Sequence, residues 1–177
     1  MSENNTLFPG VKPGETFMIG DMEFIRFADC NGQTPVVMKD IAFRSRFGDN
    51  NDFRSSDILK KLQEDVLPKI IEAIGEENVC EFETDLTTLD GLKPYGVMKS
   101  RISLPTFDFY RANVAVFDQH KLDKWWWLAT PDTANPHYNT VWVNCVSPSG
   151  CINFGCYHFD FIGVRPFLIL KSSIFGS

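Results

Sequence analysis

The sequence predicts an α+β domain, because short β-rich runs that alternate in two-residue steps accompany one segment with a helical apolar face. The runs lie at 15–27, 35–38, 79–86 and 141–154, and the helical segment lies at 58–74. The 177 residues, 44% of them hydrophobic, are enough to bury one core. We therefore expect a single domain in which a helix or two packs on small antiparallel sheets.

The N-terminal part predicts a flexible arm followed by a β-hairpin. Residues 1–13 are polar and interrupted by Pro and Gly, so the domain is expected to cover 14–177. Residues 15–27 contain two β-rich runs joined by a turn at Gly20-Asp21. A third strand, 35–38, follows a second turn.

The clearest helix is expected to begin after Ser55-Ser56-Asp57, which offers a capping side chain. Pro68 lies inside the apolar pattern and predicts two helical pieces or a kink, and Gly75 predicts the end of the helix. The apolar face is formed by Ile58, Leu59, Leu62, Val66, Leu67, Ile70, Ile71 and Ile74.

The middle of the chain predicts a strand over 79–86 and a short strand over 101–105. The second strand leads to Thr106, whose hydroxyl can cap an aromatic helix at 107–111. Nothing in this region carries a catalytic motif.

Composition excludes several classes of function. A net charge of −6 and a pI near 5.0 argue against nucleic-acid binding, which requires clustered Lys and Arg. No stretch is apolar enough to cross a bilayer and no leader is visible, so we expect a protein made in the cytoplasm without membrane insertion. The five cysteines lack the spacing of a zinc site or a secreted disulfide framework, which predicts reduced thiols.

Two apolar stretches, 125–132 and 163–170, enclose a polar, aromatic and cysteine-bearing segment, 133–162. Within it, 141–144 and 151–154 predict a hairpin across a turn at 147–150. We expect one framework face, made of Val141, Val143 and Ile152, and an opposite face that carries Trp142, Asn144, Cys151 and Asn153.

The enclosed segment predicts a binding surface, because exposed aromatic side chains beside hydrogen-bonding ones give large contact area at small entropic cost. The expected anchors are Tyr138, Phe154, Tyr157 and Phe161. The expected polar contacts are Asn139, Asn144, Asn153, His158 and Asp160, with Trp142 and Cys151 completing the site.

The enclosing stretches resemble a known family. Trp126-Trp127-Leu128-Ala129-Thr130-Pro131 and Gly163-Val164-Arg165-Pro166-Phe167-Leu168 are similar to the WWLR(S/T)P…GVRPAL signature of a bacterial and phage domain family, a branch of the C-type-lectin-like fold. Residues 102–110 also resemble that family, and the likeness covers most of 14–171. The resemblance implies a C-type-lectin-like fold, although Ala129 replaces the usual Arg.

The resemblance also implies a mechanism of diversification. Several proteins of this fold are variable proteins of diversity-generating retroelements, whose C-terminal segment is mutated at template adenines. Randomised AAC codons never encode Lys, Glu, Gln, Met or Trp, and 133–162 contains none of these except Trp142. The absence of long side chains from an ordinary surface hairpin explains the same pattern equally well. Random substitution would account for the three cysteines of this segment.

Framework roles are expected for Trp126 and Trp127, which should be largely buried. Trp125, the third tryptophan of the run, would lie at the rim of the binding surface. Arg165 stands between buried-looking strands and should need a carboxylate, for which Asp132 is the predicted partner.

We expect no enzyme, no cofactor and no metal. The competing enzymatic hypotheses are a nucleophilic couple of His158 with Cys156 or Cys151, and a copper-binding Cys151–Cys156 pair like that of formylglycine-generating oxidases, which share the lectin-like fold. Calcium-dependent sugar binding is disfavoured because Trp142-Val143-Asn144 only resembles the Trp-Asn-Asp run of such lectins.

The preferred function is recognition of a protein or cell-surface ligand. The alternative class is a structural protein of a phage particle, a fibre tip or surface decoration, and the two are compatible. A homo-oligomer, a trimer by family analogy, would fit a displayed module of this kind.

Overall fold

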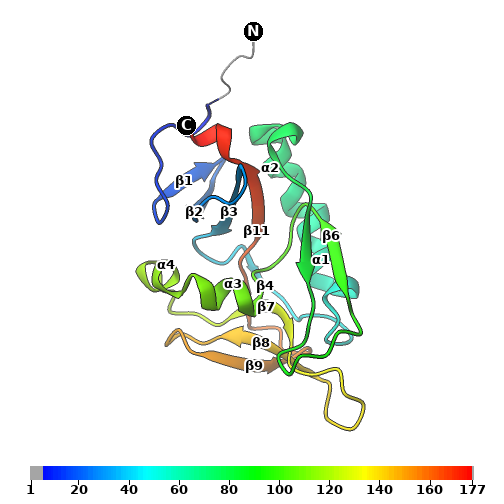
Figure 1. Cartoon of the computed structure of the whole chain (residues 1–177). Helices are drawn as coiled ribbons and strands as arrows, with labels where there is room; N and C mark the ends of the chain where they lie inside the picture. The colour runs from blue at the N-terminus through cyan, green and yellow to red at the C-terminus, as the bar shows by residue number, and fades with distance from the viewer. Residues whose placement is uncertain (1–5, 177) are drawn as a thin grey trace.

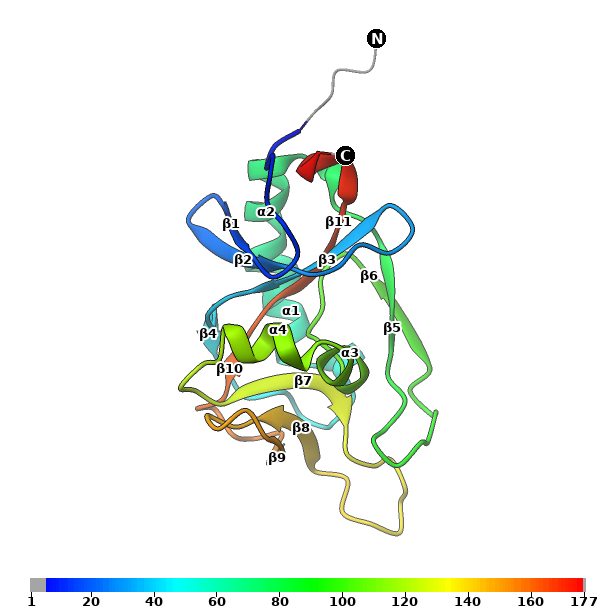
Figure 2. The ribbon, with the colours of Figure 1, turned by 60° about the vertical axis from the view of Figure 1, so that its left-hand side comes forward.

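The computed structural model describes residues 6–176, which form an α+β arrangement of three sheets and several short helices. One sheet has the order β1-β2-β3-β11, a second β4-β10-β7-β8-β9, and a third β5-β6 (Figures 1 and 2). The strands are β1 (Thr16–Ile19), β2 (Met22–Arg26), β3 (Gln33–Met38), β4 (Phe43–Arg44), β5 (Phe82–Asp85), β6 (Val97–Ser100), β7 (Trp126–Pro131), β8 (Trp142–Val146), β9 (Ile152–Cys156), β10 (Gly163–Val164) and β11 (Phe167–Lys171).

The N-terminal hairpin is confirmed. β1 pairs antiparallel with β2 across the Gly20-Asp21 turn, and β3 follows a turn in which Asn31 and Gly32 both have positive φ, 52° and 76°. Asn and Gly tolerate this conformation better than other residues, so the turn chemistry fixes the hairpin locally.

The long helix is also confirmed, and its irregularity lies where Pro68 predicted one. The helix consists of α1 (Asp57–Lys61), a π-helical turn η2 (Leu62–Val66) and α2 (Leu67–Ile74). The Ser56 hydroxyl accepts the Leu59 N–H at 3.0 Å, and the left-handed Gly75 ends the helix. Pro68 has no N–H to give to the preceding turn, and the wider π turn accommodates this loss.

Two helices cover one side of the β7 sheet. Thr106 caps α3 (Phe107–Ala112) as predicted, accepting the Phe109 N–H at 3.2 Å. α4 (Val114–Gln119) follows directly and was not predicted. The short 3₁₀ turns are η1 (Phe53–Ser55), η3 (Glu76–Asn78) and η4 (Ser172–Phe175).

The strand predicted at 101–105 is wrong. Only Ser103 pairs, in an isolated bridge with Phe167. The Ser100 hydroxyl donates a hydrogen bond to the Ile102 carbonyl, which is then not free to pair with a strand, and Pro105 has no N–H to donate. β6, one segment earlier, is the strand that pairs with β5.

Residues 6–13 do not form the free arm that the sequence predicted, since the Phe8 N–H donates to the Ile174 carbonyl at 2.8 Å. The Phe8 ring lies 4.7 Å from that of Phe17, and Val11 also packs against the core. The rest of the predicted arm, residues 1–5, lies outside the described residues. The first and last described segments are therefore adjacent, at the end of the molecule opposite β8 and β9 (Figure 1).

Candidate functional site

The β8–β9 hairpin is present as predicted and forms the edge of the five-stranded sheet. Trp142 pairs with Cys156, Asn144 with Phe154, and Val146 with Ile152. The connection at 147–151 is closed by the Ser147 N–H, which donates to the Cys151 carbonyl at 2.9 Å. Gly150 adopts a φ of 85°, as a turn glycine does.

The predicted assignment of hairpin faces is right for Val143, Trp142 and Asn144 and wrong for Ile152 and Asn153. Paired residues share a face, so Ile152 lies with Trp142 and Asn144, and Val143 lies on the opposite face with Cys145. Val143 and Cys145 are buried in the main core. The observed pairing is one residue out of phase with the pairing that would place Ile152 beside Val143, and a one-residue offset moves a side chain to the other face.

Asn144 is a framework residue and not a ligand contact, which corrects the prediction. Only 1% of it is exposed, and its amide nitrogen donates to the Thr130 carbonyl at 3.1 Å. β7 loses regular register with β8 between Trp127 and Pro131, so this carbonyl needs a side-chain donor. A buried amide that makes this hydrogen bond cannot also contact a bound ligand.

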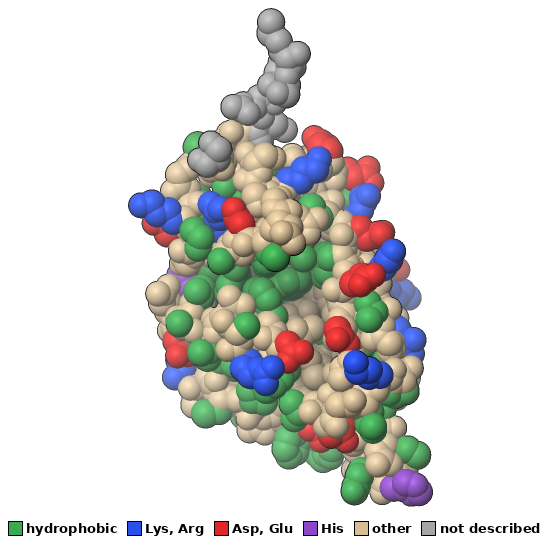
Figure 3. Space-filling model, viewed as in Figure 1, with side chains coloured by type: hydrophobic (Ala, Val, Ile, Leu, Met, Phe, Trp, Pro, Cys, Tyr) green, Lys and Arg blue, Asp and Glu red, His purple; other side chains and the backbone are tan. Residues whose placement is uncertain are grey.

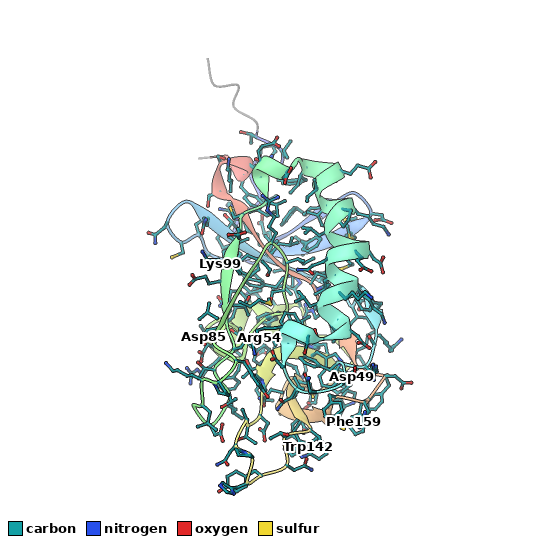
Figure 4. The ribbon with its side chains drawn as sticks, turned by 90° about the vertical axis from the view of Figure 1, so that its right-hand side faces the viewer. Asp49, Arg54, Asp85, Lys99, Trp142 and Phe159 are labelled. Carbon is teal, nitrogen blue, oxygen red and sulfur yellow. The ribbon has the colours of Figure 1, made fainter. Side chains whose placement is uncertain are left out.

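Four aromatic side chains form a continuous outer cluster, which we call the aromatic surface: Trp142, Phe154, Phe159 and Phe161. The Trp142 ring lies 5.2 Å from Phe154 and 6.5 Å from Phe159, and the Phe159 and Phe161 rings stack at 5.3 Å. Phe154 and Phe161 are 52% and 51% exposed. Trp142 and Phe159 lie near the lower end of the molecule in Figure 4, and the face in Figure 3 also carries some hydrophobic side chains at that end.

Phe159 was absent from the predicted site. The signal that could have found it is its place in the run Phe159-Asp160-Phe161, whose two rings the chain brings together on one side. Four polar residues that the sequence predicted are exposed: Asn139, Asn153, His158 and Asp160. His158 and Asp160 flank Phe159 in the chain, and Asn139 lines a hollow together with Trp142. Asn153 pairs with Cys145 and therefore lies on the face of β9 opposite Phe154, which corrects its predicted place beside Trp142.

Three other predicted contacts have different surroundings. Tyr157 is half-buried and packs against the core, with its backbone bonded to Val141 and Phe47. Tyr138 is 67% exposed but stands on the separate 133–141 loop. Cys151 lies at the hairpin turn, the far end of β9 from the aromatic surface.

The 133–141 loop is fixed at its base. The Asn51 amide nitrogen donates to the Thr133 carbonyl at 2.8 Å, and its amide oxygen accepts a hydrogen bond from the Tyr95 hydroxyl. The Thr133 hydroxyl donates to Asp90 at 2.6 Å. Side chains far apart in the sequence therefore hold the root of the loop while its tip is exposed.

The framework tryptophans are buried as predicted. Trp126 and Trp127 are 2% and 0% exposed, and the Trp127 indole N–H donates to the Ser45 carbonyl at 2.9 Å. Trp125 is half-buried and packs against the core. The sheet beneath the aromatic surface is thus a rigid support.

The predicted Arg165–Asp132 pair does not form. Arg165 donates to the carbonyls of Met38 and Lys39, each at 2.9 Å, and its guanidinium stacks on Trp126 at 4.6 Å from the ring centre. Burial lowers the pKa of Arg165 to about 10, and Asp40 opposes that effect. Backbone oxygens and an aromatic face replace the expected carboxylate.

The enzymatic alternatives find little geometric support. Cys151 immediately precedes β9 and Cys156 ends it, and at about 3.4 Å per residue of strand the two are separated by roughly 17 Å, too far for one copper ion. The His158 ring packs edge-on against the Tyr157 ring, with centroids 4.3 Å apart. Among residues 6–176, no group of three or more His, Cys, Asp or Glu side chains could hold a metal ion.

No protein-family model matches the chain, and neither a curated protein nor a solved structure does. In the described part of the chain, no helix is both long and apolar enough to cross a membrane. The α+β architecture and the geometry of the aromatic surface therefore carry the functional interpretation.

Proposed function

We propose that this chain is a ligand-binding module of C-type-lectin-like fold, which recognises a protein or cell-surface ligand through the aromatic surface. The observation that carries the proposal is the exposed ring cluster of Trp142, Phe154, Phe159 and Phe161. Contiguous exposed apolar patches are rare on monomeric proteins and mark sites of interaction. Aromatic residues bordered by hydrogen-bonding ones match the composition of protein-binding sites.

The support beneath the cluster favours recognition with little rearrangement. β8 is held between β7 and β9, and Gly155 brings β9 so close to Trp127 that an added Cβ would lie 3.1 Å from the indole ring. Rings held in place before binding lose little conformational entropy when a partner covers them. Truncating such an anchor typically weakens binding by about 2 kcal/mol or more.

Diversification by a retroelement is part of the same proposal. The exposed residues of 133–162 are separated from buried ones, so substitutions confined to exposed positions would leave the framework intact. The exposed residues of this segment are Pro136, His137, Tyr138, Asn139, Ser149, Cys151, Asn153, Phe154, His158, Phe159, Asp160 and Phe161. The buried residues are Thr133, Val143, Asn144, Cys145, Val146, Ser147, Gly155 and Ile162. A near-repeat of the coding sequence for 133–166, with adenines at the exposed positions and beside a reverse transcriptase, would support this part, and a locus without such a repeat would refute it.

Display on a phage particle is the second candidate, and one observation favours it. The segments containing Phe8 and Ile174 are bonded to each other at the end opposite the aromatic surface (Figure 1), so attachment through either end would direct the surface outward. Electron microscopy of particles labelled with an antibody to this chain tests the virion location. The trimer implied by the resemblance is tested by light scattering on the purified protein.

The binding proposal is tested by capturing a partner with the wild-type chain and repeating the capture with Phe154→Ala/Phe161→Ala. We expect the double variant to lose binding by about 30-fold or more. Met18→Ala is the control, since Met18 is similarly exposed but lies on β1, at the other end. Equal capture by the wild type and the double variant would refute the assignment of the surface.

A further inference from the structure

A hollow of about 420 Å³ lies beside the aromatic surface, between the 86–96 connection and the 133–141 loop. Two aromatic side chains, Tyr138 and Trp142, form part of its wall, and Trp142 also belongs to the aromatic surface. The remaining lining residues are Leu89, Asp90, Asp132, Thr133 and Asn139. The hollow and the aromatic surface are thus continuous through Trp142.

The charged groups in the lining are both carboxylates. Asp90 is held in place, because its carboxylate accepts hydrogen bonds from the hydroxyls of Thr133, at 2.6 Å, and of Thr88. These hydrogen bonds keep the pKa of Asp90 below its usual value, so Asp90 is ionised at neutral pH. A fixed negative charge therefore faces the hollow.

Asp132 forms no ion pair with any residue of 6–176. Its pKa is raised by burial and by the charge of Asp90, and no cation or donor of the described residues offsets these effects. Two carboxylates that line one open hollow repel each other, and a positive group placed between them would relieve that repulsion. Arg165, the cation that the sequence suggested, is engaged elsewhere.

The walls discriminate between kinds of cation. Calcium needs six to eight oxygen ligands, whereas the hollow offers two carboxylates of which one is already bonded to hydroxyls. Aromatic faces attract weakly hydrated organic cations, and Trp is the most effective ring for this purpose. A guanidinium or ammonium group satisfies both the carboxylates and the rings.

We propose that this hollow binds a cationic side chain of the partner, an arginine or lysine, between Asp132 and the Trp142 ring. The inference rests on the proposed function, since it names the chemistry of a contact next to the aromatic surface. Phe154 and Phe161 would supply apolar contact area, and the hollow would select for positive charge.

The probe is Nα-acetyl-arginine methylamide, with the citrulline analogue as a neutral control of nearly the same shape. Binding is followed by the NMR signal of the Trp142 indole N–H, assigned with Trp142→Phe. We expect a saturable shift with the arginine compound and a weaker one, by about fivefold or more in affinity, with citrulline. Asp132→Asn should weaken arginine binding by a similar factor, and Asp21→Asn, an exposed carboxylate in the β1–β2 turn, should not.

Equal affinity for both compounds, or unchanged arginine binding by Asp132→Asn, would overturn the inference. Phe154→Ala/Phe161→Ala separates it from the proposed function, because this variant keeps Asp132 and Trp142. Retained arginine binding in a variant that no longer captures the partner would support both assignments. Absent arginine binding alongside a partner capture that depends on Phe154 and Phe161 would refute the cation site alone.

Discussion

The guanidinium carbon of Arg165 lies 4.6 Å from the centre of the Trp126 ring, with the Phe117 ring at 5.5 Å. The same side chain donates to two backbone carbonyls at the end of β3. Arg165 therefore connects the two larger sheets, because Met38 belongs to one of them and Trp126 to the other. Its flat, forked shape is what allows both kinds of contact.

Arg165→Lys should destabilise the fold by about 2 kcal/mol, since an ammonium group cannot stack on Trp126 while it bonds both carbonyls. Urea unfolding measures the free energy of unfolding of the wild type and the variant. Arg111→Lys is the control, because Arg111 forms an exposed pair with Asp108 and should change stability by less than about 0.5 kcal/mol. Equal losses in the two variants would contradict the role given to Arg165.

Gly155→Ala should destabilise the fold by about 1–3 kcal/mol through overpacking. The added Cβ would lie 2.7 Å from Ile162 Cδ1 and 3.1 Å from the Trp127 ring. Asn153→Ala, an exposed change two residues away, should be nearly neutral. Thermal unfolding of the two variants compares them directly, and a stable Gly155→Ala protein would show that β9 can move away from the core.

Asp132→Asn should be more stable than the wild type at pH 7. The pKa of Asp132 is raised above 3.8 in the folded state, so ionisation of this group costs stability above the folded pKa. The wild type recovers that stability as the pH falls through the folded pKa toward 3.8, and the variant does not. Urea unfolding at several pH values should show a difference that disappears near pH 3.8, whereas a salt-bridged carboxylate would give the opposite sign.

Cys145 should resist thiol reagents in the folded protein. Burial raises its pKa from 9.0 to about 12, which lowers its thiolate fraction about a thousandfold. Cys151 is exposed and should react quickly. Reaction with a disulfide reagent is compared between the wild type, Cys145→Ser and Cys151→Ser, so that the signal each variant loses identifies its cysteine among the five free thiols. Fast reaction of Cys145 would mean that β8 opens readily.

Features fixed by short-range chemistry could be predicted from the sequence. The Ser56 cap, the irregularity before Pro68 and the Asn31-Gly32 turn each depend on a few adjacent residues. The β8–β9 hairpin was found for the same reason, because alternation and a turn signal lie within one segment.

Features that depend on distant partners could not be predicted. Arg165 bonds carbonyls that lie more than one hundred residues earlier, 127 in the case of Met38, and a carbonyl leaves no trace in the sequence. Asn144 was predicted to lie on the surface. Its hydrogen-bond partner is the Thr130 carbonyl, which is left without a strand partner only because the β7–β8 register is irregular there, and the sequence does not reveal that irregularity. The hollow was missed because Asp90 and Asp132 meet only in the folded chain.

Asn51 fixes the base of the 133–141 loop from outside the loop, which affects how freely the loop sequence can evolve. Its amide joins Tyr95 to the Thr133 carbonyl, so the root of the 133–141 loop is specified by residues outside the loop. Substitutions at the tip then cost little folding free energy, and new sequences can be sampled without selection for a new scaffold. By this criterion the loop is the part of the molecule best suited to grafting foreign peptides, provided that Asn51 is kept.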